Sequence, residues 1–325
     1  MIVTYNDPSS ILDDANYTMN TYDIGRGSSR YYEKHACRHL QLKTCLKTIE
    51  NDWSSLNTDT EKAILQRHAS YAQHITTSYA VFMQLTGILL IFKSSMTLLF
   101  EDTTNTTLPI IVAESKLPFR VEYGEKMRQC LFPVAIHCYL AVFAHSNITI
   151  AVDSLYITLV HHACGMFKIV GITDEDYGKA LSCLRRHLHV IEFAELIEAT
   201  FTNIFLVGVC LNMIGGSMIG IQVVLNLDDA KDVVEPLTIY IAQLFHLFLQ
   251  FWQGQFLLTY SAVPYESICR ANWYYTSGRC RKILLLIMNR TVLPCKLTAG
   301  KIVILSIETF GVVNQTALLL SIFLL

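Results

Sequence analysis

Long apolar blocks with few or no charged residues alternate with short charged segments along this chain. About 20 helical residues, each rising 1.5 Å, cross the hydrocarbon core of a bilayer, so an apolar block of that length predicts a transmembrane helix. Five blocks predict five spans, over residues 68–100, 129–158, 199–227, 236–265 and 302–325. We therefore expect an all-α fold, that of a polytopic helical membrane protein.

The segments between these blocks predict the orientation of the chain. Cytoplasmic loops of membrane proteins carry an excess of lysine and arginine. Segments 1–67, 159–198 and 266–301 hold 19 of the 25 lysines and arginines, whereas 101–128 and 228–235 hold five. The counts predict an inner N-terminus and an outer C-terminus, with residues 1–67 forming a polar cytoplasmic segment.

The segment 266–301 is predicted to be a cytoplasmic helical region. It contains a basic amphipathic stretch, 279–290, whose apolar centre of six residues is too short to cross a bilayer. Residues 68–325 as a whole form the predicted helical transmembrane domain. The short acidic segment 228–235 predicts a tight helical hairpin between the third and fourth spans.

Composition supports lipid as the surroundings of most of the chain. Hydrophobic residues make up 52% of it and charged residues only 16%, against roughly 25% charged in soluble domains. The net charge is −2 and no basic tract is present, which argues against nucleic acid as a partner. The ten cysteines are scattered, and no sequence motif of an enzyme stands out, so we expect no disulfide framework, catalytic residue or cofactor.

Some polar or small residues within the blocks need an interpretation. His161 and His162 are adjacent, do not share a helix face and have no carboxylate at a ligand spacing, so we predict no metal site. Glu308 in the last block is costly against lipid and must face protein or water, which leaves a structural role and a role in ion conduction equally open. The G-x-x-x-G spacing in 215–220 predicts close helix packing. Asn105 is a glycosylation candidate in the first outer loop.

Aromatic and polar residues mix in the outer halves of the first, second and fourth spans. An apolar cavity with a few polar groups is the usual character of a small-molecule site, although plain helix packing is the alternative for each residue. The candidates for ligand binding are Phe82, Met83, Phe92, His137, Tyr139, Phe143, Tyr240 and Gln243, with Gln84 and Phe245 beside them.

From about Asp52 onward, an ordered set of short sequences resembles the insect odorant receptor family. These sequences are 51–53 (Asn-Asp-Trp) with Leu56, 161–167 (His-His-Ala-Cys-Gly-Met-Phe), 189–195 (His-Val-Ile-Glu-Phe-Ala-Glu), 251–255 (Phe-Trp-Gln-Gly-Gln), 272–274 (Asn-Trp-Tyr), 282–290 (Lys-Ile-Leu-Leu-Leu-Ile-Met-Asn-Arg) and 306–310 (Ser-Ile-Glu-Thr-Phe). The family has seven spans, so the five spans here correspond to its third through seventh.

The resemblance implies a function. The chain is expected to be the odorant-binding subunit of a ligand-gated, non-selective cation channel in the plasma membrane of sensory neurons. Its expected partners are a volatile small molecule, membrane lipid and a shared co-receptor in a heterotetramer. The last helix is expected to line the pore, with Ser321, Leu324 and Leu325 near the outer gate.

Other interpretations remain at this point. A gustatory receptor subunit has the same topology, and the absence of two spans makes a non-functional receptor fragment a further alternative. A transporter predicts inverted repeats, which the sequence does not show. A G-protein-coupled receptor requires the opposite orientation.

Overall fold

The computed structural model describes residues 26–56, 58–100, 127–170, 177–225, 230–271 and 273–324. The chain divides into two compact units, 1–47 and 48–325, which are described separately. The described part of the first unit is the N-terminal part of α2 (Arg26–Ser55), a largely polar helix in which the Thr44 hydroxyl donates to the Leu40 carbonyl over 2.8 Å. Everything that follows concerns the second unit.

Two long helices, α3 (Asp59–Phe100) and α5 (Met127–Val170), pack against each other. Thr58 and Glu61 form a capping box at the start of α3: the Thr58 hydroxyl accepts from the Glu61 amide at 3.3 Å, and the Glu61 carboxylate accepts from the Thr58 amide at 3.4 Å. Close packing depends on Gly165 of α5, where an added Cβ would lie 2.8 Å from Leu65 Cδ1.

The next pair, α6 (Tyr177–Leu225) and α7 (Ala230–Tyr260), forms the hairpin that the sequence predicted. The helix α6 is continuous over the third predicted span and the charged segment before it. A Cβ at Gly216 would lie 3.8 Å from Tyr240 of α7, and one at Gly220 would lie 3.2 Å from Ser321 of the C-terminal helix. The predicted role of this glycine segment in close helix packing is therefore confirmed.

The fourth predicted span, 236–265, extends further than the helix. The helix α7 ends at Tyr260, and a turn at 261–262 leads into α8 (Val263–Arg270), which has Pro264 in its first turn. Proline has no amide hydrogen and disfavours a helical conformation in the residue before it, so a new helix starts here. The short 3₁₀ helix η3 (Trp273–Tyr275) and α9 (Gly278–Thr291) follow.

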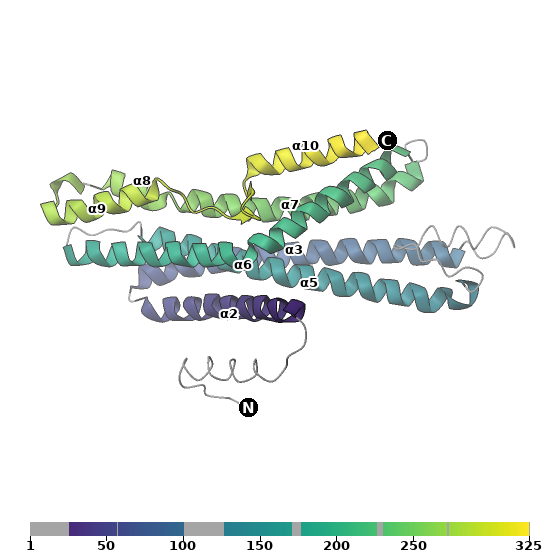
Figure 1. Cartoon of the computed structure of the whole chain (residues 1–325), viewed down its shortest axis with the longest axis horizontal. Coiled ribbons are helices and arrows are strands. Elements are labelled where there is room, and N and C mark those ends of the chain that lie inside the picture. Colours follow the sequence, from purple (N-terminus) through teal and green to yellow (C-terminus); the bar gives the residue numbers. More distant parts are fainter. Residues whose placement is uncertain are drawn as a thin grey trace, which may run out of the picture. The chain divides into compact units, whose positions relative to one another are not determined.

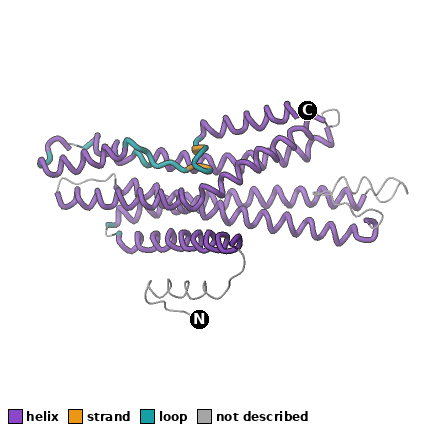
Figure 2. The backbone as a smooth tube through the Cα atoms, viewed as in Figure 1, coloured by secondary structure: helices purple, strands orange, loops and turns teal. Residues whose placement is uncertain are grey.

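A small β-hairpin lies between α9 and the helix that ends the described part of the chain, and Figure 2 shows its strands in orange. It pairs β1 (Thr298–Ala299) with β2 (Val303–Ile304) in antiparallel register. Gly300 and Lys301 make the turn with φ of 64° and 61°, a region that favours glycine. The predicted fifth span, 302–325, therefore starts too early: α10 runs from Ile307 to Leu324.

Figure 1 shows α8 and α9 at one end of this unit and the C-terminal end of α10 at the other. The helix α10 packs on α6 and α7. Near the C-terminal end of α10, the helices α6, α7 and α10 lie side by side. The parts of α3 and α5 at this end of the unit diverge from these three helices (Figure 1).

Three helices in the described part of the chain are long and apolar enough to cross a membrane, over Asp59–Phe92, Tyr139–Val170 and Ala180–Leu225. The helix α10 is apolar but shorter. The amide and imidazole side chains of Gln243, His246, Gln250, Gln253 and Gln255 interrupt the apolar sequence of α7. The count of five spans stays a prediction.

Candidate ligand site

A buried polar network joins α3, α5 and α7 about halfway along α3. Its centre is Asp153 of α5, whose side chain is only 8% exposed. Its carboxylate accepts hydrogen bonds from the Tyr79 hydroxyl at 2.6 Å, from the His246 imidazole at 2.8 Å and from the Gln250 amide at 3.2 Å. Because a carboxylate offers acceptors, His246 donates through its Nε2–H.

The network continues around the edge of Asp153. The Tyr156 hydroxyl donates to the Gln250 main-chain carbonyl at 3.4 Å. The rings of Tyr79 and His246 stack with their centroids 6.2 Å apart. Burying a carboxylate requires several donors to replace its water, and here the donors come from the two helices next to α5. The network therefore fixes the relative register of three helices.

An aromatic layer covers this network on the side predicted to be extracellular. The rings of Phe82 on α3 and Phe245 on α7 meet with centroids 4.6 Å apart and planes at 59°. One turn of α3 beyond Tyr79, Met83 is half-buried, and Gln84 donates to the Asn147 side chain of α5 at 3.2 Å. Apolar rings above a polar floor match the usual character of a small-molecule site.

Two more predicted ligand residues lie between α7 and α6. The Gln243 amide donates to the Asn212 carbonyl at 3.2 Å, and Tyr240 is half-buried near Gly216. The structure thus places four predicted residues, Phe82, Met83, Tyr240 and Gln243, on the sides of α3 and α7 that face other helices.

The other four predicted ligand residues lie elsewhere. Phe92 of α3 and Phe143 of α5 are each 56% exposed in the single chain. His137 is also exposed, and Tyr139 is half-buried. The ring contact of Phe82 in the described part of the chain is with Phe245.

Of the residues predicted for the gate, Ser321 and Leu324 belong to the last turns of α10. Ser321 is 5% exposed, packs beside Gly220 of α6 and donates its hydroxyl to the Leu318 carbonyl at 2.7 Å. The Leu324 side chain and the whole of Leu325 lie outside the described residues, as does the glycosylation candidate Asn105. Glu308 is exposed in the first turn of α10.

The two adjacent histidines of α5 have different environments. His162 and His189 of α6 both bond to Asp52 of α2, at 2.9 Å and 2.8 Å, whereas His161 is packed among the rings of Tyr71 and Phe256. Within the residues described, no group of three or more histidine, cysteine, aspartate or glutamate side chains could hold a metal ion.

Sequence reasoning missed the residues at the centre of the network. Asp153 lies inside a predicted span, where a carboxylate signals a functional or structural partner. His246 and Gln250 are four residues apart on α7 and share a face. These two signals, taken together, could have pointed to the network.

Comparison with known proteins decides the family. The sequence profile described as 7tm Odorant receptor matches residues 35–318. The chain belongs to this family. Its fold also matches the insect olfactory receptor OR5 of Machilis hrabei in complex with eugenol, with a TM-score of 0.60 and 12% identity over 89% of this chain and 79% of that one.

A second structure of the Machilis hrabei receptor OR5 also matches this fold. Its TM-score is 0.59 and its identity 13%, over 89% of this chain and 78% of that one. At such low identity these matches show the fold alone. A search of curated protein sequences gives no significant match.

Family membership has direct consequences. This odorant receptor family member is a multi-pass helical membrane protein and not an enzyme. The match is to odorant receptors, which sets aside the gustatory receptor, the transporter and the G-protein-coupled receptor as families for this chain. The resemblance found in the short sequence segments is confirmed.

Proposed function

We propose that this chain is the odorant-binding subunit of a ligand-gated, non-selective cation channel in the plasma membrane of sensory neurons. It works with a shared co-receptor in a heterotetramer and has an inner N-terminus and an outer C-terminus. A volatile molecule binds beside the Phe82–Phe245 pair, between α3 and α7. The observation that carries this proposal is the aromatic layer of Phe82 and Phe245 above the Asp153 network, in a chain whose family is that of odorant receptors.

The position of α7 links this site to α10. Phe245 lies on the same helix as Gly254, which contacts the backbone of Leu305, two residues before α10 begins. Phe248 and Phe251 of α7 also contact the ring of Phe310 in α10. A ligand that binds better when α7 holds its open-channel position shifts the equilibrium toward opening, and only such a difference in affinity can do so.

The helix α10 has one packed face and one exposed face. Val313, Ala317 and Ser321 are buried at four-residue intervals against the neighbouring helices. The opposite side exposes a stripe that consists of Glu308, Val312, Gln315, Leu319 and Ile322. In the proposed channel this stripe faces the pore, with Glu308 toward its inner end, so that this carboxylate contributes to conduction.

The proposal is tested by recording whole-cell currents in a null cell line that expresses this chain with an insect odorant co-receptor. Cells with the co-receptor alone are the control. A cation current that a volatile compound evokes only when both chains are present supports the proposal. If a broad panel of volatiles evokes none, although surface labelling shows both chains, the chain does not function as an odorant-binding subunit by itself.

The proposed ligand site makes a prediction for side-chain truncation. We expect Phe82→Ala and Phe245→Ala each to raise the half-maximal odorant concentration about tenfold, which corresponds to about 1.4 kcal/mol of lost binding energy. Ile241→Ala is the matched control, because Ile241 lies on α7 like Phe245 but its side chain is 53% exposed. Dose–response curves measure the effect. Equal shifts in all three variants would place the ligand elsewhere.

The proposed orientation makes a prediction for thiol labelling. Cys269 is exposed in α8, outside the predicted spans. Cys295 is in the same predicted cytoplasmic region, but burial raises the pKa of its thiol to about 11, so Cys295 is mostly protonated near neutral pH and unreactive. We expect a membrane-impermeant maleimide to label Cys269 only after the cells are permeabilised. Labelling of the intact wild type that disappears in Cys269→Ser would reverse the orientation.

A further inference from the structure

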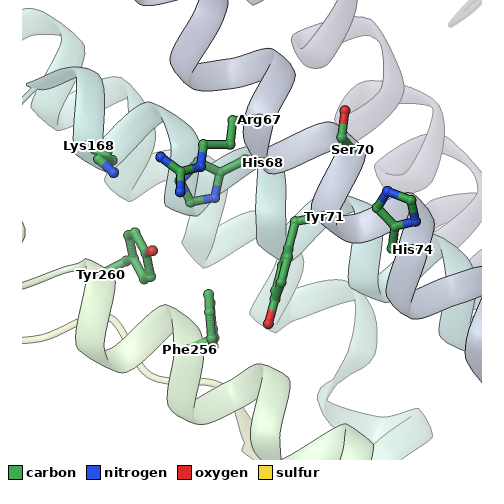
Figure 3. A pocket seen from close by; sticks show the side chains of 8 residues that line it. All are labelled: Arg67, His68, Ser70, Tyr71, His74, Lys168, Phe256 and Tyr260. Carbon is green, nitrogen blue, oxygen red and sulfur yellow. The ribbon is translucent and has the colours of Figure 1, made fainter.

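A cavity of about 500 Å³ opens between α3, α5 and α7, away from the proposed odorant site. It is lined by Arg67, His68, Ser70, Tyr71, His74, Lys168, Phe256 and Tyr260. Figure 3 shows the side chains of α3 on one side of it, Phe256 and Tyr260 of α7 opposite, and Lys168 of α5 nearby. Tyr71 is eight residues before Tyr79, so the cavity lies about 12 Å along α3 from the Asp153 network.

The charges around this cavity all have one sign. Arg67 and Lys168 are both in its wall, and none of the eight lining residues is acidic. Within the described part of the chain, neither cation forms an ion pair or a side-chain hydrogen bond. Two cations that share a cavity without a counter-charge favour an anionic ligand.

Aromatic rings form the rest of the wall. Phe256 and Tyr260 stack with centroids 5.1 Å apart, and Tyr71 stacks on Phe256 at 6.2 Å. Behind them lies His161, a fully buried imidazole with neither ring nitrogen bonded to the described residues. The rings of Tyr71, Phe256 and Tyr260 therefore offer an apolar surface to a ligand whose anionic group lies between Arg67 and Lys168.

The place of the cavity in the fold indicates where such a ligand comes from. Lys168 is in the last turn of α5, and Arg67 is near the start of α3. Under the proposed orientation both lie at the inner end of their helices. The inner leaflet carries the anionic lipids, and basic pockets between transmembrane helices on this side bind phosphorylated headgroups.

We propose that this cavity binds the phosphate-bearing headgroup of an anionic lipid of the inner leaflet. Arg67 and Lys168 hold the phosphate, and Tyr71, Phe256 and Tyr260 pack against the apolar part. The bound lipid connects α3, α5 and α7, the three helices that the Asp153 network also joins. Binding needs no odorant, so it can be tested independently of the proposed function.

The test uses the purified full chain in a non-ionic detergent and a fluorescent dioctanoyl phosphatidylinositol 4-phosphate as the probe. We expect saturable binding that weakens at least tenfold in the double variant Arg67→Gln/Lys168→Gln. The control Lys62→Gln/Arg185→Gln removes the same charge from exposed positions outside the cavity and should bind like the wild type. Dioctanoyl phosphatidylcholine should not compete.

Three results would overturn the proposal. They are equal competition by phosphatidylcholine, equal weakening in the two double variants, and no saturable binding to the wild type. Competition by soluble inositol 1,4-bisphosphate at the concentrations of the lipid would show that the cavity takes a soluble phosphate ester instead. If the double variant does not fold, the charge-conserving Arg67→Lys/Lys168→Arg should keep binding, and each single glutamine variant should weaken it.

Discussion

Replacing Asp153 by alanine is expected to lower the stability of this odorant receptor family member strongly. The substitution leaves the Tyr79 hydroxyl, the His246 imidazole and the Gln250 amide without their shared acceptor in a buried region. Each buried donor that loses its partner costs about 1–3 kcal/mol. The expected loss of stability is therefore about 3 kcal/mol or more.

The effect is measured as the melting midpoint of the purified, fluorescently tagged chain, together with its amount at the cell surface. Asp153→Asn keeps one acceptor oxygen and should retain part of the stability. Thr158→Ala is the control on the same helix, because Thr158 is exposed and donates only to the Ser154 carbonyl of its own helix. If Asp153→Ala melts like Thr158→Ala, the network does not hold the three helices together.

The second large effect is expected for Gly254→Ala, at the contact between α7 and the segment before α10. A Cβ at this position would lie 2.3 Å from the Leu305 carbonyl oxygen and 2.5 Å from the Leu305 Cβ. These are backbone or near-backbone atoms, so relief requires moving the segment that leads into α10. Overpacking of this kind costs about 1–3 kcal/mol, and it should also displace the proposed pore helix.

We expect Gly254→Ala to lower the melting midpoint and to abolish the odorant-evoked current even where the chain reaches the surface. The control is Gly208→Ala in α6, where an added Cβ meets no atom within 4 Å. Alanine is a better helix former than glycine by about 1 kcal/mol, so Gly208→Ala should be neutral or slightly stabilising. A normal current and midpoint in Gly254→Ala would show that the Leu305 segment moves freely.

The hairpin around Leu305 shows a limit of sequence reasoning. The pattern of apolar residues made 302–325 look like one continuous span, because a strand and a helix that are both apolar differ little over a few residues. The fold instead holds Thr298 through the Glu198 carboxylate, which accepts from the Thr298 amide at 2.7 Å, and the Gly300 amide donates to the Thr202 carbonyl at 2.8 Å. These partners are about a hundred residues away and leave no local signal.

The candidate ligand site was predicted only in outline. The pattern of aromatic and polar residues along the first and fourth predicted spans does not say which face of a helix they occupy, and small differences in rotation decide which face meets a neighbouring helix. Phe82 therefore meets Phe245 while Phe92, ten residues along the same helix, is exposed. The pairing of Asp153 with Tyr79 and His246 has no local signal, because these partners lie 74 and 93 residues away in the sequence.

Taken by itself, the sequence determined that this protein is helical, belongs in a membrane and resembles insect odorant receptors, because length, hydropathy and short local motifs are properties of contiguous residues. Only the tertiary structure decided how those motifs meet. Asp52, His162 and His189 come from three separate motifs and converge in one hydrogen-bonded cluster. Likewise, Arg67 and Lys168 share a cavity although a hundred residues separate them. Such pairings depend on the packing of long helices, which hydropathy along the chain does not encode.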